Sequence, residues 1–288
     1  EILLKSKPKT STDFINHDYF INHHTISYNY SATLLREMKQ KRQTPKYQKL
    51  LAFAPIFNNQ ETQNSRVFSI RGGLNALKYN IPEAESIADI LNGKVLIGEK
   101  ATLQNFTEEA WKYSILHCAT HGKADDENAH YSYLAFTEKD SNDYLLYVRD
   151  LYNMELSADL VTLSACETGI GKLYRGEGIA SLARGFSYAG ARSIVTTLWS
   201  VNDKKTAELM ESFYQNLKSG MGKDVALREA KLTYLNHNDV NACHPYYWAA
   251  AIAIGDMSPV QIEESSWFLF GIFGLSLLLI GGIFIFKK

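Results

Sequence analysis

Apolar runs alternate with amphipathic stretches along most of the chain, and this alternation predicts a series of strands and helices. From residue 75 onwards, strands are expected over 95–97, 113–119, 160–165, 193–198 and 249–254. Helices are expected between them, over 83–91, 102–110, 178–189, 203–217 and 224–234. Because several of these strands are continuously apolar, the pattern favours a mostly parallel sheet with helices on both faces.

Five further segments have patterns that predict structure. Residues 26–30 alternate as a strand does, and Ser31 is suited to cap a helix that runs to about Arg42. Residues 50–56 indicate a buried strand that is interrupted by Pro55. Residues 131–136 and 144–148 are expected to pair as a hairpin.

Composition narrows the class of protein. The chain has 288 residues, of which 45% are apolar and 21% charged, so it can bury a sizeable core and is not of the disordered type. A net charge of −1 supplies no basic field for nucleic acid, and none is expected as a partner. Three cysteines, Cys118, Cys166 and Cys243, do not describe a disulfide-stapled fold.

The C-terminal segment predicts a membrane anchor. Residues 267–286 carry no charge, and a helix of that length spans about 30 Å, the thickness of a bilayer core. A buried core helix is the alternative. Residues 257–266 are expected to be a linker, and Lys287 and Lys288 a basic tail. Because basic flanks favour the cytoplasmic side, the soluble domain is expected outside the cytoplasm.

Two motifs carry candidate chemistry. Residues 117–122 (HCATHG) and 163–169 (LSACETG) each contain the end of an apolar strand and place a reactive side chain, His121 or Cys166, close to glycine. If the two strands are parallel neighbours, both residues meet at one sheet edge, where imidazole can activate a thiol. The N–H groups of Gly122 and Cys166 could then bind an oxyanion.

Other interpretations of these residues stay open at this point. Cys166 could be a packing cysteine, and His121 an ordinary core or surface histidine. The spacing of His117 and His121 would suit zinc on a helix, although the segment reads as a strand. The glycines after residue 168 invite a phosphate loop, but their spacing does not match a known one.

Taken together, the motifs resemble the CHAT domain, a branch of the caspase and separase clan of cysteine peptidases. The similar segments span about residues 20–256 and occur in the family's order. They are 26–35 (ISYNYSATLL), 116–122 (LHCATHG), 163–171 (LSACETGIG), 176–178 (GEG), 182–186 (LARGF), 188–193 (YAGARS), 197–199 (TLW) with Asp203, and 244–249 (HPYYWA).

The resemblance implies a caspase-like three-layer α/β sandwich over residues 1–256, N-terminally incomplete. The linker and the one transmembrane helix expected from the apolar C-terminal run would follow it. It assigns a catalytic dyad to His121 and Cys166, and an oxyanion role to Gly122. It implies no metal or organic cofactor. It also suggests that tetratricopeptide repeats, or another sensor, lie upstream.

Substrate preference is predicted less directly. The caspase signature Q-A-C-x-G differs here on both sides of Cys166, so a preference for aspartate does not carry over. Acidic residues near the motifs could instead favour basic substrate side chains. These candidates are Asp125, Asp126, Glu167, Glu177 and Asp203.

The sequence therefore predicts a membrane-anchored cysteine endopeptidase that acts on protein or peptide substrates. The competing hypothesis is a catalytically silent caspase-like scaffold that binds protein partners at the membrane. A weaker third option is an acyltransferase that uses the same thiol.

Overall fold

The computed structural model describes most of the chain up to residue 262. The described ranges are 14–40, 45–57, 74, 76–125, 128–139, 144–164, 177–237 and 242–262, and of 177–181 only the backbone is described.

Six strands form the main sheet, in the order β2-β1-β3-β7-β8-β9. Their bounds are β1 Tyr47–Ala54, β2 Lys94–Ile97, β3 Tyr113–Ala119, β7 Leu160–Ser164, β8 Ser193–Thr197 and β9 Ala251–Gly255. Five of them are parallel, and β9 pairs antiparallel with β8 at one edge. The mostly parallel sheet expected from the apolar runs is confirmed.

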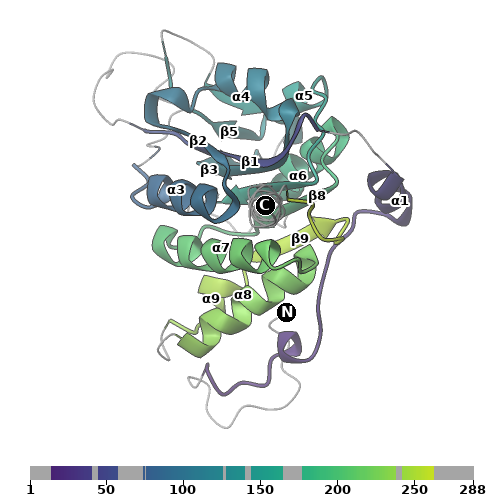
Figure 1. The fold of residues 1–288 in the computed structure, drawn as a ribbon, viewed down its shortest axis with the longest axis vertical. Coiled ribbons are helices and arrows are strands. Elements are labelled where there is room, and N and C mark those ends of the chain that lie inside the picture. Colours follow the sequence, from purple (N-terminus) through teal and green to yellow (C-terminus); the bar gives the residue numbers. More distant parts are fainter. Residues whose placement is uncertain are drawn as a thin grey trace, which may run out of the picture.

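Helices cover both faces of this sheet (Figure 1). One face packs against α3 (Asn80–Leu91), α7 (Asp203–Lys218) and α8 (Lys223–His237). The other packs against α1 (Ala32–Gln40), α4 (Leu103–Glu109), α5 (Val148–Leu151) and α6 (Glu177–Ala189). Shorter helical segments are η1 (Phe20–Asn22), η2 (Gly98–Lys100), η3 (Ala110–Lys112), η4 (Ala129–Tyr131) and α9 (Pro245–Trp248).

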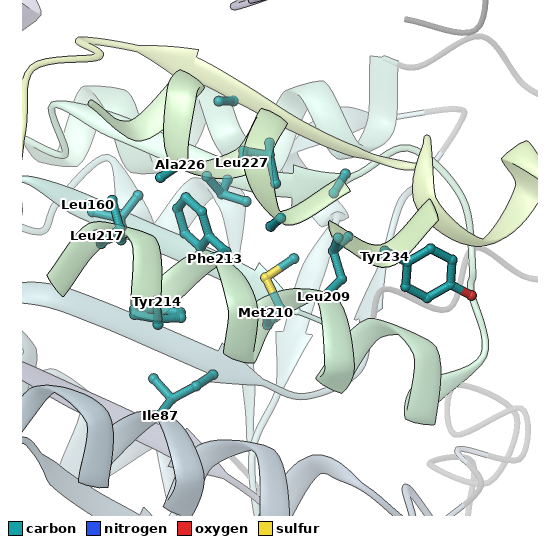
Figure 2. Packing of buried hydrophobic residues seen from close by; sticks show 14 of the residues in the cluster. Ile87, Leu160, Leu209, Met210, Phe213, Tyr214, Leu217, Ala226, Leu227 and Tyr234 are labelled. Carbon is teal, nitrogen blue, oxygen red and sulfur yellow. The ribbon is translucent and has the colours of Figure 1, made fainter. Parts of the chain in front are cut away.

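Alternate side chains of each strand enter different cores. In β3, Ile115 packs towards α3 and α7, whereas Leu116 packs towards α4 and α6. Figure 2 shows the first of these cores, in which Phe213 and Met210 of α7 lie among residues of α8 and the sheet. Burial of these side chains is the main force that holds the helices on the sheet.

A small antiparallel sheet is inserted between β3 and β7. It consists of β4 (Gly122–Lys123), β5 (Tyr133–Ala135) and β6 (Leu145–Tyr147), in that order. The expected hairpin is therefore confirmed as β5 and β6. The third strand, β4, was not predicted, and it begins directly after His121.

Two predictions near the chain ends have different outcomes. Within 26–30, Tyr28 alone pairs, as a single bridge to Ile254, so the expected strand is wrong. The helix after Ser31 is confirmed as α1, and the Ser31 hydroxyl accepts the Leu34 N–H at 3.1 Å.

The predicted membrane anchor at 267–286 lies outside the described residues. Among the helices that are described, none combines the length and the apolar character needed to cross a bilayer.

Candidate active site

The strands that precede the two motifs are parallel neighbours at the centre of the sheet. β3 pairs with β7 in a register that sets Ala119 opposite Ser164. Pairing continues past the strand end, because the Thr120 N–H donates to the Ser164 carbonyl at 3.2 Å. His121 therefore emerges at the carboxyl edge of the sheet, directly beside the end of β7.

His121 is held in a closed environment. Its side chain is fully buried, and its ring lies 4.7 Å from the ring of Phe57, at an angle of 57°. Its carbonyl accepts the Ala135 N–H at 2.9 Å, which joins it to β5. The contact with Phe57 was not predicted from the sequence. Its signal was an aromatic residue just beyond β1, the strand next to β3.

The neighbours of His121 attach the site to the small sheet. The Thr120 hydroxyl donates to the Ala135 carbonyl, and buried Gly122 pairs in register with Leu134. The segment 120–122 is thus bonded on one side to β7 and on the other to β5. Such double attachment fixes the backbone from which an imidazole must act.

Five polar side chains lie beneath this edge, inside the core between the sheet and helices α3 and α7. We call them the polar layer, and they are Glu83, His117, Thr162, Ser164 and Tyr214. The Ser164 hydroxyl donates to Glu83 Oε1 at 2.5 Å, and His117 Nε2 lies 3.2 Å from the same oxygen. His117, which the zinc interpretation would have placed on a helix, lies in β3 and is fully buried.

Tyr214 closes the polar layer on the α7 side, where Figure 2 shows it at the edge of the apolar cluster near Ile87. Its hydroxyl donates to Thr162 Oγ1 at 2.8 Å and lies 3.2 Å from His117 Nδ1. Burial raises the pKa of Tyr214 far above its usual value, although the bond to Thr162 acts in the opposite direction. The phenol therefore stays protonated.

The predicted acidic candidates are only partly placed. The Asp125 carboxylate accepts the Asn128 N–H at 2.7 Å and so stabilises the loop after β4. Asp203 is the first residue of α7, which follows β8 and so begins at the carboxyl side of the sheet. Asp126 and Glu167 lie outside the described residues, and the Glu177 side chain is not described.

The structure describes two of the three cysteines. Cys166 lies outside the described residues, whereas Cys118 and Cys243 are both fully buried. Across the part of the chain that the structure describes, no three His, Cys, Asp or Glu side chains gather as a metal site requires.

Known proteins share parts of this chain. Tetratricopeptide repeat protein 28 of Mus musculus is 30% identical over 122 residues, and that of Homo sapiens is 29% identical over the same length. In each case the match covers 42% of this chain and 5% of the relative, so the chain spans about a twentieth of these proteins.

Two solved structures show partial likeness to this chain. The Arg-specific cysteine proteinase gingipain R is 10% identical, with a TM-score of 0.49 over 79% of this chain and 52% of that one. A Saccharomyces cerevisiae separase–securin complex is 14% identical, with a TM-score of 0.46 over 80% of this chain and 14% of that one.

A family model gives the assignment. The model described as the CHAT domain matches residues 4–256, which is most of the chain and includes both motifs. This chain therefore belongs to the CHAT domain family.

Proposed function

We propose that this CHAT domain is a cysteine endopeptidase in which Cys166 is the nucleophile and His121 the general base. One observation carries the proposal. Ala119 and Ser164 lie opposite each other in the register of β3 and β7. His121 follows Ala119 by two residues along the chain, and Cys166 likewise follows Ser164 by two residues. Neighbouring strands lie about 4.8 Å apart, so equal offsets from a register pair favour side chains within reach of each other.

The proposed reaction uses ordinary thiol chemistry. His121 accepts the Cys166 proton, and the thiolate adds to the scissile carbonyl. The Gly122 and Cys166 N–H groups stabilise the oxyanion. The imidazolium then gives its proton to the leaving amine, and water hydrolyses the thioester with His121 again as base. No step needs a metal or an organic cofactor.

The surroundings of His121 support this role. Its burial and its contact with Phe57 exclude water from one side of the imidazole, and its backbone is bonded to β5. A preorganised base loses little freedom in the transition state, which is a general source of rate enhancement.

The first test is labelling of the folded protein with a peptide that carries a thiol-reactive electrophile. Because Cys118 and Cys243 are fully buried, we expect labelling to be confined to Cys166 and to be abolished by Cys166→Ala. His121→Asn should slow it at least 100-fold, on the order of a typical general-base contribution. The matched control is His23→Asn, an exposed histidine paired with Asp18, which should label normally.

The same labelling experiment distinguishes the peptidase from the silent scaffold, and analysis of the products distinguishes it from an acyltransferase. Equal labelling of all three cysteines, unchanged by His121→Asn, would contradict the peptidase and favour the catalytically silent scaffold. An acyltransferase would label as the peptidase does, but would transfer the acyl group to an added amine rather than to water.

A preference for basic substrate residues stays part of the proposal. Of the acidic candidates, Asp203 stands at the start of α7 on the carboxyl side of the sheet. Cleavage of a peptide library after Lys or Arg would support it, and cleavage after neutral or acidic residues would exclude it. We also propose tetratricopeptide repeats upstream, because curated relatives carry that name.

A further inference from the structure

The polar layer interrupts what is otherwise an apolar interface. Glu83 is 5% exposed and Ser164 1%, and His117, Thr162 and Tyr214 are as deeply buried, among side chains such as Ile87 and Phe213. Burying polar groups carries a desolvation penalty that burying apolar side chains does not. Apolar residues at these positions would therefore usually give a more stable core. Their arrangement therefore calls for a reason other than packing.

One carboxyl group in this layer touches both strands that lead to the proposed dyad. Glu83 Oε1 accepts the Ser164 hydroxyl at 2.5 Å, and Ser164 is the last residue of β7. The same oxygen lies 3.2 Å from His117 Nε2, and His117 belongs to β3. Glu83, which belongs to a third element, α3, thus bonds to the last residue of β7 and lies against His117 of β3.

The first turn of α3 strengthens this connection. Asn80, one turn before Glu83, donates through Nδ2 to the Pro55 carbonyl at 2.8 Å and to the Ala119 carbonyl at 3.3 Å. These carbonyls lie at the carboxyl ends of β1 and β3. One helical turn therefore contacts the ends of three neighbouring strands at the edge that carries His121.

We propose that Glu83 is a positioning residue: its contacts with Ser164 and His117 set the distance between the Cys166 thiol and the His121 imidazole. The proposal rests on the proposed function, since it assigns a role within that dyad. Cys166 follows Ser164 by two residues, and two peptide units span at most about 7 Å, so Ser164 is an anchor point close to the thiol along the chain. Displacement by about 1 Å can cost 100-fold in rate.

The test measures alkylation of Cys166 by iodoacetamide as a function of pH, with the modified residue quantified by mass spectrometry. Iodoacetamide forms a thioether at Sγ and releases iodide, so its rate reports the thiolate. An isolated cysteine thiol has a pKa near 8.5, and pairing with an imidazole lowers that pKa. The pH midpoint of the rate therefore reports how closely the two side chains approach.

Glu83→Gln retains an oxygen that can accept the Ser164 hydroxyl but replaces the carboxyl group that faces His117 with an amide. We expect it to move the pH midpoint upwards by about one unit, which slows alkylation about tenfold at pH values below both midpoints. Ser164→Ala, which removes the other contact, should produce a similar shift. The matched control is Thr162→Val, which alters the same layer without touching Glu83 and should keep the wild-type midpoint.

The outcomes distinguish the two proposals. If His121→Ala leaves the wild-type midpoint unchanged, the dyad itself is wrong and the proposed function fails. If His121→Ala raises the midpoint but folded Glu83→Gln and Ser164→Ala do not, the dyad stands and the positioning role of Glu83 is overturned. Circular dichroism establishes folding, and if Glu83→Gln does not fold, Ser164→Ala decides.

Discussion

At the scale of single residues, the buried lysine Lys223 couples stability to pH. It is 1% exposed, and its Nζ donates to the Asp256 carbonyl at 3.0 Å. Burial lowers the pKa of Lys223 to about 8, although the Asp159 and Asp256 carboxylates act to raise it. Arg192 joins the same two carboxylates, at 2.6 Å from Asp159.

The pKa of Lys223 predicts stability that rises with alkaline pH. Between the folded value of about 8 and the ordinary value of 10.5, the unfolded chain binds more protons than the folded one. The free energy of unfolding therefore increases with pH in that window, by about 2 kcal/mol from pH 7 to pH 9.5. Below pH 8 the lysine is charged in both states and adds no slope.

Urea denaturation of a Lys223→Met variant checks this expectation. The variant lacks the rise, so its stability relative to wild type should fall by about 2 kcal/mol between pH 7 and pH 9.5. Lys218→Met, at the exposed end of α7, is the matched control and should show no such change. A constant difference for Lys223→Met would show that its charge is not perturbed.

Individual site residues differ in how far the sequence could predict them. His121 was identified because it follows an apolar strand and precedes a glycine. The prediction that this strand, β3, is a parallel neighbour of β7 is confirmed. The buried contacts of Glu83 were not predicted, because a glutamate at the start of a helix reads as an ordinary N-terminal acid. Its contact with Ser164 joins segments far apart along the chain, which no local pattern encodes.

At the scale of elements, the end of α6 depends on one glycine. Gly190 has φ of +119°, and a Cβ atom there would lie 2.1 Å from the Leu156 carbonyl oxygen. The Leu156 N–H donates to the Ala189 carbonyl at 2.6 Å, so backbone passes directly against the helix end. A side chain fits neither the backbone conformation nor the space.

Gly190→Ala should therefore destabilise the protein severely, by about 3 kcal/mol or more, because strain and a backbone clash add. Gly220→Ala is the matched control. Gly220 also has positive φ, +86°, but nothing lies within 4 Å of the added Cβ, so about 1 kcal/mol of strain is expected. Thermal unfolding of both variants measures the difference, and equal losses would contradict the clash.

Elements differ in how well pattern predicts them, and length explains much of the difference. The strands expected at 113–119, 160–165 and 193–198 match β3, β7 and β8 within one residue, because continuous apolar runs are unmistakable. By contrast, β4 has two residues, and α5 and α9 have four each. Such segments are much shorter than the window over which a periodic pattern can be recognised, and tertiary contacts decide them.

At the scale of the whole molecule, the attachment to a membrane stays a prediction from composition. We expect the full chain to remain with membranes after alkaline carbonate extraction, and a variant that ends at residue 266 to be released. Release of the full chain would contradict a spanning helix at 267–286. Protease protection of the domain in sealed vesicles checks the predicted orientation.

The single bridge between Tyr28 and β9 has a consequence for handling the protein. The Tyr28 N–H donates to the Ala253 carbonyl at 2.8 Å, and the Gly255 N–H donates to the Tyr28 carbonyl at 3.1 Å. This short contact occupies donors and acceptors on the outer side of β9 that could otherwise recruit a strand from another molecule. Shortened versions that start after Tyr28 would leave that side bare, and are expected to self-associate and precipitate as their concentration rises.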